Sequence, residues 1–398
     1  MTTLERLVDP ADPYPGLRRL RERAPVYRHV SRTTGRSYWY LTTYDDVQRV
    51  LLDPGLGREL DRLPAELAAA HRRGEHDPLA MLRRNVFNLD PPDHTRLRRL
   101  LAPAFGARTV AALDLRIREV AGELADGLTG DVDLIEALAL PLPILVVAEL
   151  LGLPAADRPR LRRWSDVMLR SGDPVLVRAA GMEFAAYVEE RIAERRASPG
   201  DDLLSRLVRA EPSGAIDRDE LVSSVFQLLM AGDETTVNLI GNGVLELLRH
   251  PGQLARLRAR PQLIDTAIEE MVRFNGPVGH SRMVYAMSEV TIGATTIPQG
   301  DVVVPVLLAA NRDPAAFPRP DDFDIGRTPN RHLGFGHGLH FCLGAALARS
   351  QARAAIGTLV HRFPEMSLAI DPADLEWTPE LFLHGVRRLP LTLKGTRS

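Results

Sequence analysis

The chain of 398 residues contains one cysteine, and the residues around it restrict the fold more than any other stretch. Two closely spaced glycines precede Cys342, Gly344 follows it, and a helix-forming run occupies 345–349. This order predicts a thiolate at a helix N-terminus, where unpaired N–H groups and the helix dipole stabilise negative sulfur. The glycines permit a tight turn and close approach of a planar partner, while Phe335 shields the sulfur from water.

A lone cysteine is most often a small buried hydrophobe, and one sulfur cannot build a cysteine zinc cluster. The pattern Phe-Gly-x-Gly-x-His-x-Cys-x-Gly-x-x-Leu-Ala-Arg changes this interpretation, because it resembles the haem-binding loop of the cytochromes P450 over fifteen positions without a gap. The resemblance implies that Cys342 is the proximal thiolate ligand of haem b iron. It also implies that Phe335, His340 and Gly344 lie against the cofactor.

Composition places the chain among ordinary globular proteins, with 45% hydrophobic and 26% charged residues. A net charge of -2 gives no sign of nucleic-acid binding. One cysteine excludes an intrachain disulfide, which is consistent with a reducing cytoplasm. The N-terminus lacks a signal-peptide pattern, and acids and prolines interrupt the most apolar stretch, 134–153. We expect a soluble cytoplasmic protein without a membrane or nucleic-acid partner.

The hydrophobic pattern predicts a mainly α fold with small β-sheets. Residues 108–209 are helical with short breaks, and a long helix runs from about 219 to 250. Together with the resemblance, this implies the cytochrome P450 fold in one domain over 1–398, with a large helical lobe and a smaller β-containing lobe. Strands are predicted at 37–42, 290–292, 296–298 and 302–307.

An arginine-rich helix starts after a Pro-Pro-Asp sequence. His94 and Arg98 lie four residues apart on one face, where two donors suit a pair of carboxylates. Such a helix is usually a solvated surface. The segment also resembles the C-helix of the cytochromes P450, which implies that His94 and Arg98 hold the haem propionates. The resemblance assigns the same role to Arg282 and His340.

The centre of the long helix reads Ala-Gly-Asp-Glu-Thr-Thr, from Ala231 onward. Ala231, Gly232 and Thr235 share a face whose small side chains leave room for a ligand, and a threonine hydroxyl there can bond back to the i−4 carbonyl. The alternative is a kinked core helix with outward-facing acids. The stretch resembles the distal signature of the family, which implies Glu234 and Thr235 as catalytic residues beside a cofactor that Ala231 contacts.

Glu270 and Arg273 lie three residues apart on the next helix, an arrangement that is most often a weak surface salt bridge. The pair also matches the family's Glu-x-x-Arg motif. That resemblance implies a structural role, with Arg327 as third member, in locking the cysteine loop.

The resemblance implies a monooxygenase that hydroxylates or epoxidises a small lipophilic molecule, a macrolide, steroid-like compound or other secondary metabolite. O₂ would be the oxidant, with electrons from a ferredoxin and its ferredoxin reductase. A peroxygenase driven by H₂O₂ is one alternative, although that type typically lacks the distal acid–alcohol pair. A non-catalytic haem-binding sensor is another, and it would not need Glu234 or Thr235.

A ferredoxin that delivers electrons needs a surface on this protein to bind to, and an acidic ferredoxin would bind a basic one. Arg96 and Arg99, together with Arg349 and Arg353 after the cysteine loop, are expected to form a basic patch that attracts it. The alternative is four solvated arginines.

Overall fold

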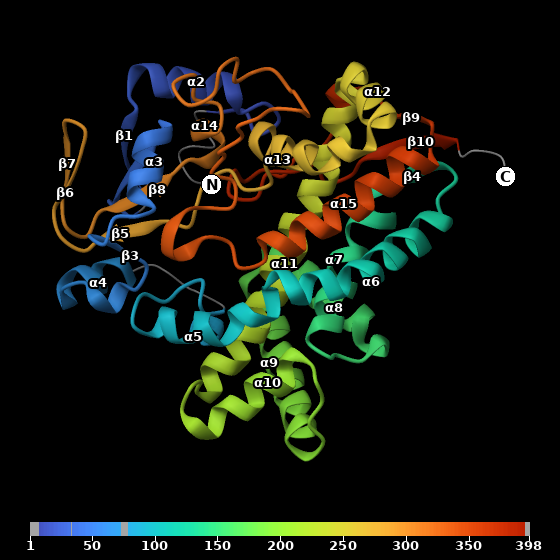
Figure 1. The fold of residues 1–398 in the computed structure, drawn as a ribbon. Helices are drawn as coiled ribbons and strands as arrows, with labels where there is room; N and C mark the ends of the chain where they lie inside the picture. Colours follow the sequence, from blue (N-terminus) through green and yellow to red (C-terminus); the bar gives the residue numbers. More distant parts are fainter. Residues whose placement is uncertain (1–7, 33, 73–78, 395–398) are drawn as a thin grey trace.

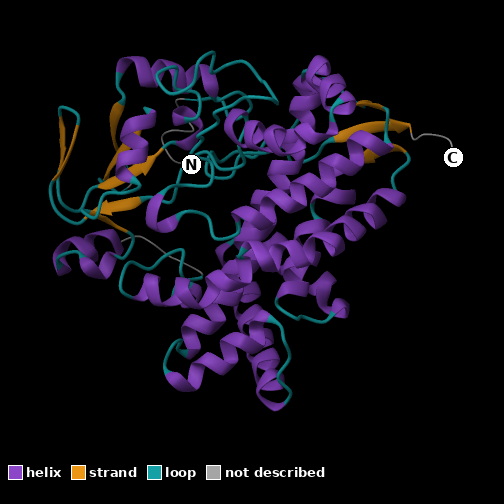
Figure 2. Cartoon of the chain, in the orientation of Figure 1, coloured by secondary structure: helices purple, strands orange, loops and turns teal. Residues whose placement is uncertain are grey.

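The computed structural model describes residues 8–32, 34–72 and 79–394. Helices fill most of this region, with three small sheets at its margins, as Figure 2 shows. The predominance of helix confirms the predicted mainly α class. The helices are α2 (Tyr14–Arg23), α3 (Tyr44–Val50), α4 (Ala65–Arg72), α5 (Asp93–Leu101), α6 (Ala107–Asp126), α7 (Pro141–Leu150), α8 (Arg158–Arg170), α9 (Pro174–Ala197), α10 (Leu203–Ala210), α11 (Arg218–Arg249), α12 (Pro251–Ala259), α13 (Ile264–Phe274), α14 (Leu307–Ala310) and α15 (Ala345–Arg362).

The largest sheet has five strands in the order β1-β2-β8-β5-β3, and the other two have the orders β4-β10-β9 and β6-β7. All pairings are antiparallel except the parallel pair β2–β8. The strands are β1 (Val26–Val30), β2 (Ser37–Leu41), β3 (Leu56–Gly57), β4 (Gly130–Asp133), β5 (Val284–Ala286), β6 (Val290–Ile292), β7 (Thr295–Ile297), β8 (Val302–Pro305), β9 (Glu365–Leu368) and β10 (Pro390–Lys394).

Both faces of the β2–β8 pair are buried, which explains why these strands are almost wholly apolar. Trp39, Leu41 and Val303 enter one hydrophobic cluster. Tyr40 and Val302 enter another, because successive side chains of a strand point to opposite faces. This sheet therefore joins two apolar clusters and anchors the segments that precede the site.

The long helix α11 forms the axis of the helical part, and α7, α9, α13 and α15 pack around it (Figure 1). It begins with a capping box, in which the Asp217 side chain accepts the Glu220 N–H and the Glu220 side chain accepts the Asp217 N–H. With 32 residues it extends over about 48 Å. The helix α15 lies between α11 and α6 in contact with both, so the chain after the cysteine loop returns to the core.

Several boundaries differ from the sequence-based expectations. The N-terminal region contains β1, which is not among the strands predicted from the sequence. The predicted strand 302–307 ends at Pro305, and α14 begins at Leu307 with Val306 as its N-cap. The polar stretch 60–84 contains α4, while 73–78 lie outside the described residues. Within the described ranges, no helix combines the length and apolar character needed to cross a bilayer.

Candidate active site

The cysteine loop is a tight turn held by its own backbone. Gly336 and Gly338 have φ of 73° and 70°, a conformation that side chains other than glycine rarely adopt. The Cys342 N–H donates to the Phe335 carbonyl over 2.8 Å, which closes the turn beneath the sulfur. Gly344 is the N-cap of α15. The predicted arrangement, with the sulfur directly before a helix start, is therefore present.

The surroundings of Cys342 shift the pKa of its thiol in opposite directions. Cys342 is exposed on one side. Desolvation by the protein around it nevertheless raises the pKa of the thiol, while the Gly344 N–H and the charges of Arg349 and Arg98 lower it. A metal ion bound to the sulfur would deprotonate it outright.

The helix α11 is mostly buried, but part of its centre is accessible to solvent. Ala231 is exposed and Thr235 is half-buried, whereas their neighbours Asp233 and Glu234 are only 5% and 7% exposed. The Thr235 hydroxyl donates to the Ala231 carbonyl over 2.7 Å, the i−4 bond expected from the sequence. Asp233 instead accepts a hydrogen bond from Ser165 on α8. The alternative of outward-facing acids is wrong, because both carboxylates lie inside the protein.

Four residues that are distant in sequence converge near the cysteine loop. The rings of His94 and His340 lie 4.2 Å apart. Arg98 donates to the Phe341 carbonyl over 2.8 Å, so α5 is tied to the loop itself. Burial and the nearby positive charges, including Arg58, Arg98 and Arg282, together lower the pKa of His340 to about 2. The fold therefore gathers His94, Arg98, Arg282 and His340 as expected.

These residues fit a haem. His94 is fully buried, and neither of its ring nitrogens has a hydrogen-bond partner in the described part of the chain. A buried polar side chain of this kind needs a hydrogen-bond partner, and the guanidiniums of Arg98 and Arg282 attract an anion. A pair of carboxylates such as the propionates supplies both. A Cβ added at Gly344 would meet nothing within 4 Å, which leaves space for a flat group beside the sulfur.

The predicted structural motif is assembled, and its Glu270–Arg273 pair is wholly buried. The carboxylate of Glu270 lies 2.7 Å from Arg273 Nε, and both side chains have 0% exposure. Arg327 Nε donates to Glu270 over 3.1 Å. Arg273 also donates to the Asn311 carbonyl, and the Asn311 side chain accepts the Leu333 N–H. The motif therefore reaches the start of the cysteine loop, and the alternative of a weak surface pair is wrong.

A second link from α13 to the loop was not predicted. Glu269 accepts two hydrogen bonds from Arg349, of 2.6 and 2.8 Å, and lies 3.1 Å from His332 Nε2. The Arg349 guanidinium lies 4.3 Å from the centroid of the Phe335 ring. Arg349 is the last residue of the cysteine motif, but no sequence pattern indicated its partner, since Glu269 lies on another helix.

The proposed basic patch is mostly neutralised. Arg96 turns away from the cysteine loop toward α11, where it pairs with Glu220 over 2.6 Å. Arg349 pairs with Glu269, and Arg353 with Asp265. The expected basic patch is therefore reduced, because each of these three arginines pairs with an acid that the sequence did not reveal. Arg99 is exposed, with no hydrogen bond or ion pair to any described residue.

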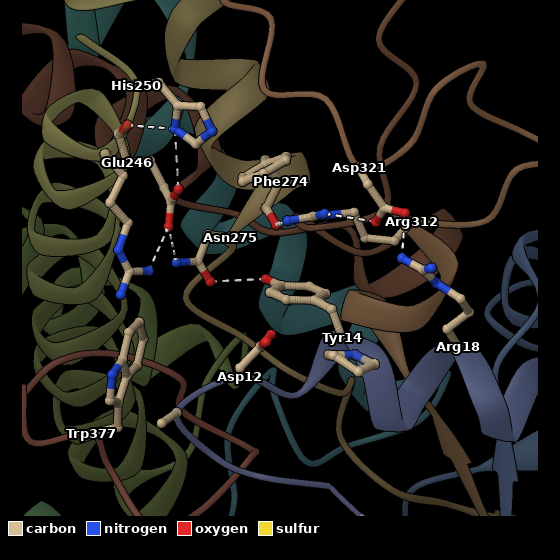
Figure 3. A pocket seen from close by; sticks show the side chains of 13 residues that line it. Asp12, Tyr14, Arg18, Glu246, His250, Phe274, Asn275, Arg312, Asp321 and Trp377 are labelled. Carbon is tan, nitrogen blue, oxygen red and sulfur yellow. Dashed lines mark hydrogen bonds and ion pairs between the residues drawn. The ribbon is translucent and has the colours of Figure 1, made fainter. Parts of the chain in front are cut away.

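A cavity of about 430 Å³ lies apart from these residues, where the ends of α11 and α13 meet the N-terminal segment (Figure 3). The Tyr14 hydroxyl donates to Asn275, whose amide donates to Glu246, each over 2.8 Å. Arg312 pairs with Asp321 over 3.0 Å. No predicted site residue lines this cavity, and its polar side chains are largely paired with one another, so we assign it no part in the chemistry.

Comparisons with known proteins agree with this geometry. The family model described as Cytochrome P450 matches residues 174–379. The cytochrome P450 monooxygenase PikC of Streptomyces venezuelae is 42% identical over 97% of this chain and 92% of its own. The 6-deoxyerythronolide B hydroxylase of Saccharopolyspora erythraea is 38% identical over 94% and 95%.

Among solved structures, the myxobacterial cytochrome P450 CYP267B1 in complex with myristic acid superimposes with a TM-score of 0.91. It is 39% identical and covers 98% of this chain and 99% of its own. The fold, the cysteine loop and the full-length similarity lead to one assignment: this chain belongs to the cytochrome P450 family of haem-thiolate monooxygenases.

Proposed function

We propose that residues 1–398 form one catalytic domain that inserts an oxygen atom from O₂ into a lipophilic natural product of the macrolide or steroid-like class. The observation that carries this proposal is the pair Glu234–Thr235 at the one exposed interruption of the buried helix α11. A buried acid next to a half-buried hydroxyl is the arrangement that a proton relay requires.

The cofactor of this proposal is haem b. Cys342 would ligate the iron, and His94, Arg98, Arg282 and His340 would hold the propionates. When bound, the haem supplies the activation of O₂, aided by electron donation from the thiolate. Phe335, whose ring lies 4.3 Å from the Arg349 guanidinium, would shield the sulfur from water, which would affect the potential of the iron.

Residues of α11 would transfer protons to the reacting oxygen. Thr235 Oγ donates to the Ala231 carbonyl, so its two lone pairs stay available to accept a hydrogen bond from a water or ligand group. Glu234, 7% exposed, would carry the proton between this hydroxyl and solvent. Ala231 leaves the space for small molecules beside that hydroxyl.

The names of the relatives support the substrate class. One relative is named as a hydroxylase of 6-deoxyerythronolide B, and one structural neighbour holds myristic acid. Both ligands are lipophilic. For the present chain we favour hydroxylation or epoxidation of such a molecule over peroxygenase activity, because Glu234 and Thr235 together form the acid–alcohol pair. A sensor would not need this pair.

A ferredoxin would supply the electrons. Arg99 on α5 is the one of the four expected arginines that remains unpaired among the described residues, so it is the best candidate for contact with an acidic partner. Changing Arg99 to Glu should slow reduction by ferredoxin, most strongly at low salt. Arg96→Gln is the matched control, because Arg96 is already bound to Glu220.

The deciding experiment compares two oxidant supplies on one panel of macrolactones, steroids and fatty acids. One reaction contains NADPH, ferredoxin reductase, ferredoxin and O₂; the other contains H₂O₂ alone. Oxygenated product from the first supply supports the proposal. Product from H₂O₂ alone would establish a peroxygenase, and binding without product from either supply would favour a sensor.

A further inference from the structure

Arg58 is a buried guanidinium that no sequence motif singled out. It directly follows β3 and is 7% exposed. Its NH1 group donates to the Phe87 carbonyl over 2.5 Å, and the guanidinium lies 5.3 Å from the centroid of the Phe87 ring. Its Nε has no hydrogen-bond partner in the described part of the chain. The side chain is therefore held in place while one donor remains unused.

A second guanidinium shares the same ring. Arg282 lies 5.5 Å from the Phe87 centroid. Arg58 is buried and Arg282 is half-buried, and two like charges on one ring repel each other more strongly here than in water. Burial and the charge of Arg282 accordingly lower the pKa of Arg58 to about 9. The charge of Arg58 also acts on His94 and His340, so it belongs to the same cluster.

The nearest acid does not neutralise this cluster. Asp90 Oδ2 accepts the backbone N–H groups of Arg58 and Glu59, over 2.8 and 3.1 Å. The same oxygen lies 3.4 Å from Arg62 NH1. Asp90 thus fixes the backbone of Arg58 and offsets its charge only in part. An anion bound beside buried Arg58 would complete the balance of charge.

We propose that Arg58 is a further haem-anchoring residue, whose unused Nε–H donates to a propionate beside Arg98 and Arg282. This inference rests on the proposed haem site. It adds a third guanidinium to the two that the sequence indicated. With three guanidiniums facing two carboxylates, the haem would be bound more tightly, and its reduced state would be favoured electrostatically.

The test uses the haem-loaded enzyme and the variants Arg58→Gln, Arg58→Lys and Arg62→Gln. Haem transfer to apomyoglobin should become about tenfold or more faster in Arg58→Gln, which corresponds to the loss of about 1.4 kcal/mol. Its reduction potential should fall, since a nearby positive charge is lost. The propionate bending band in the resonance Raman spectrum should shift, which a merely structural residue would not cause.

Two controls keep the outcome decisive. Arg62→Gln removes an exposed guanidinium from the same segment and should leave haem transfer within twofold of native. Arg58→Lys retains the charge and should keep the native potential while releasing haem faster, so it remains informative if Arg58→Gln folds poorly. A native transfer rate and propionate band in both Arg58 variants would overturn the inference. Native enzyme lacking a thiolate-haem spectrum would instead refute the haem site itself.

Discussion

The imidazole rings of His94 and His340 lie 4.2 Å apart at an angle of 57°, although one belongs to α5 and the other to the cysteine loop. Burial and nearby arginines lower the pKa of His94 to about 4 and that of His340 to about 2. Both rings are therefore neutral at physiological pH, and each carries one N–H to donate. This contact places two donors from separate elements at one point, where a carboxylate can accept both.

Replacing Cys342 with Ser should abolish thiolate ligation, because a serine hydroxyl is a far weaker donor to iron. The reduced CO complex of the native enzyme should show the red-shifted Soret band of a thiolate haem, and the variant should lack it. The variant should also lose monooxygenase activity. A native enzyme without this band would contradict the assignment of Cys342.

Replacing Thr235 with Ala should uncouple the enzyme. The change removes the hydroxyl that donates to the Ala231 carbonyl but leaves the cofactor-holding residues untouched. NADPH consumption should continue while most of the electrons go to H₂O₂. The measurement is product formed per NADPH oxidised, with Thr235→Ser as the matched control that restores the hydroxyl. If Thr235→Ala is coupled as well as native enzyme, the proton relay runs elsewhere.

Replacing Glu234 with Gln should slow turnover without releasing the cofactor. The amide keeps the volume of this buried side chain but cannot carry a proton. General acid–base steps contribute roughly 10²–10⁴-fold, so we expect kcat to fall by about 100-fold with a larger solvent isotope effect. Asp233→Asn is the control, since Asp233 is bound to Ser165. An equal loss in both variants would assign the effect to packing instead of proton transfer.

Replacing Glu270 with Gln should destabilise the enzyme. Breaking a buried ion pair costs about 3–5 kcal/mol, and Glu270 serves both Arg273 and Arg327. The midpoint of thermal unfolding and the retention of the cofactor should fall together. In the control Asp322→Asn, which removes an exposed pair with Arg319, the midpoint should be unchanged. Equal midpoints in the two variants would show that the buried motif does not stabilise the loop.

Glu269 should make stability depend on acid pH. Burial opposes its ionisation, but the bonds from Arg349 and His332 prevail and lower its pKa from 4.5 to about 2. Below about pH 4.5 the unfolded chain takes up a proton first, so this stabilisation is lost as pH falls toward 2. Thermal midpoints between pH 5 and 3 should fall less steeply in Glu269→Gln than in native enzyme or in the exposed control Glu365→Gln. Parallel curves would reject this role.

The sequence by itself determined the local chemistry of the site. The glycines around Cys342 and the sequence of 231–236 specify a turn and a helix through short-range backbone preferences, which hold wherever the segment lies. The i−4 bond of Thr235 and the positive φ of Gly336 and Gly338 follow from such preferences. The main helices were likewise readable from periodicity. The short strands β1, β4 and β9 could not be predicted from the sequence, because they form only when they pair with other segments of the fold.

Only the tertiary structure decided which charged side chains meet. Arg96 and Arg98 are two positions apart on α5, yet one bonds to Glu220 on α11 and the other to the Phe341 carbonyl in the cysteine loop. Arg58 is held near Arg282 because both guanidiniums lie over the ring of Phe87. The arginine side chain is long and flexible, so the packing of other elements determines which acid or carbonyl its guanidinium binds. Its role therefore depends on distances that no local pattern in the sequence encodes.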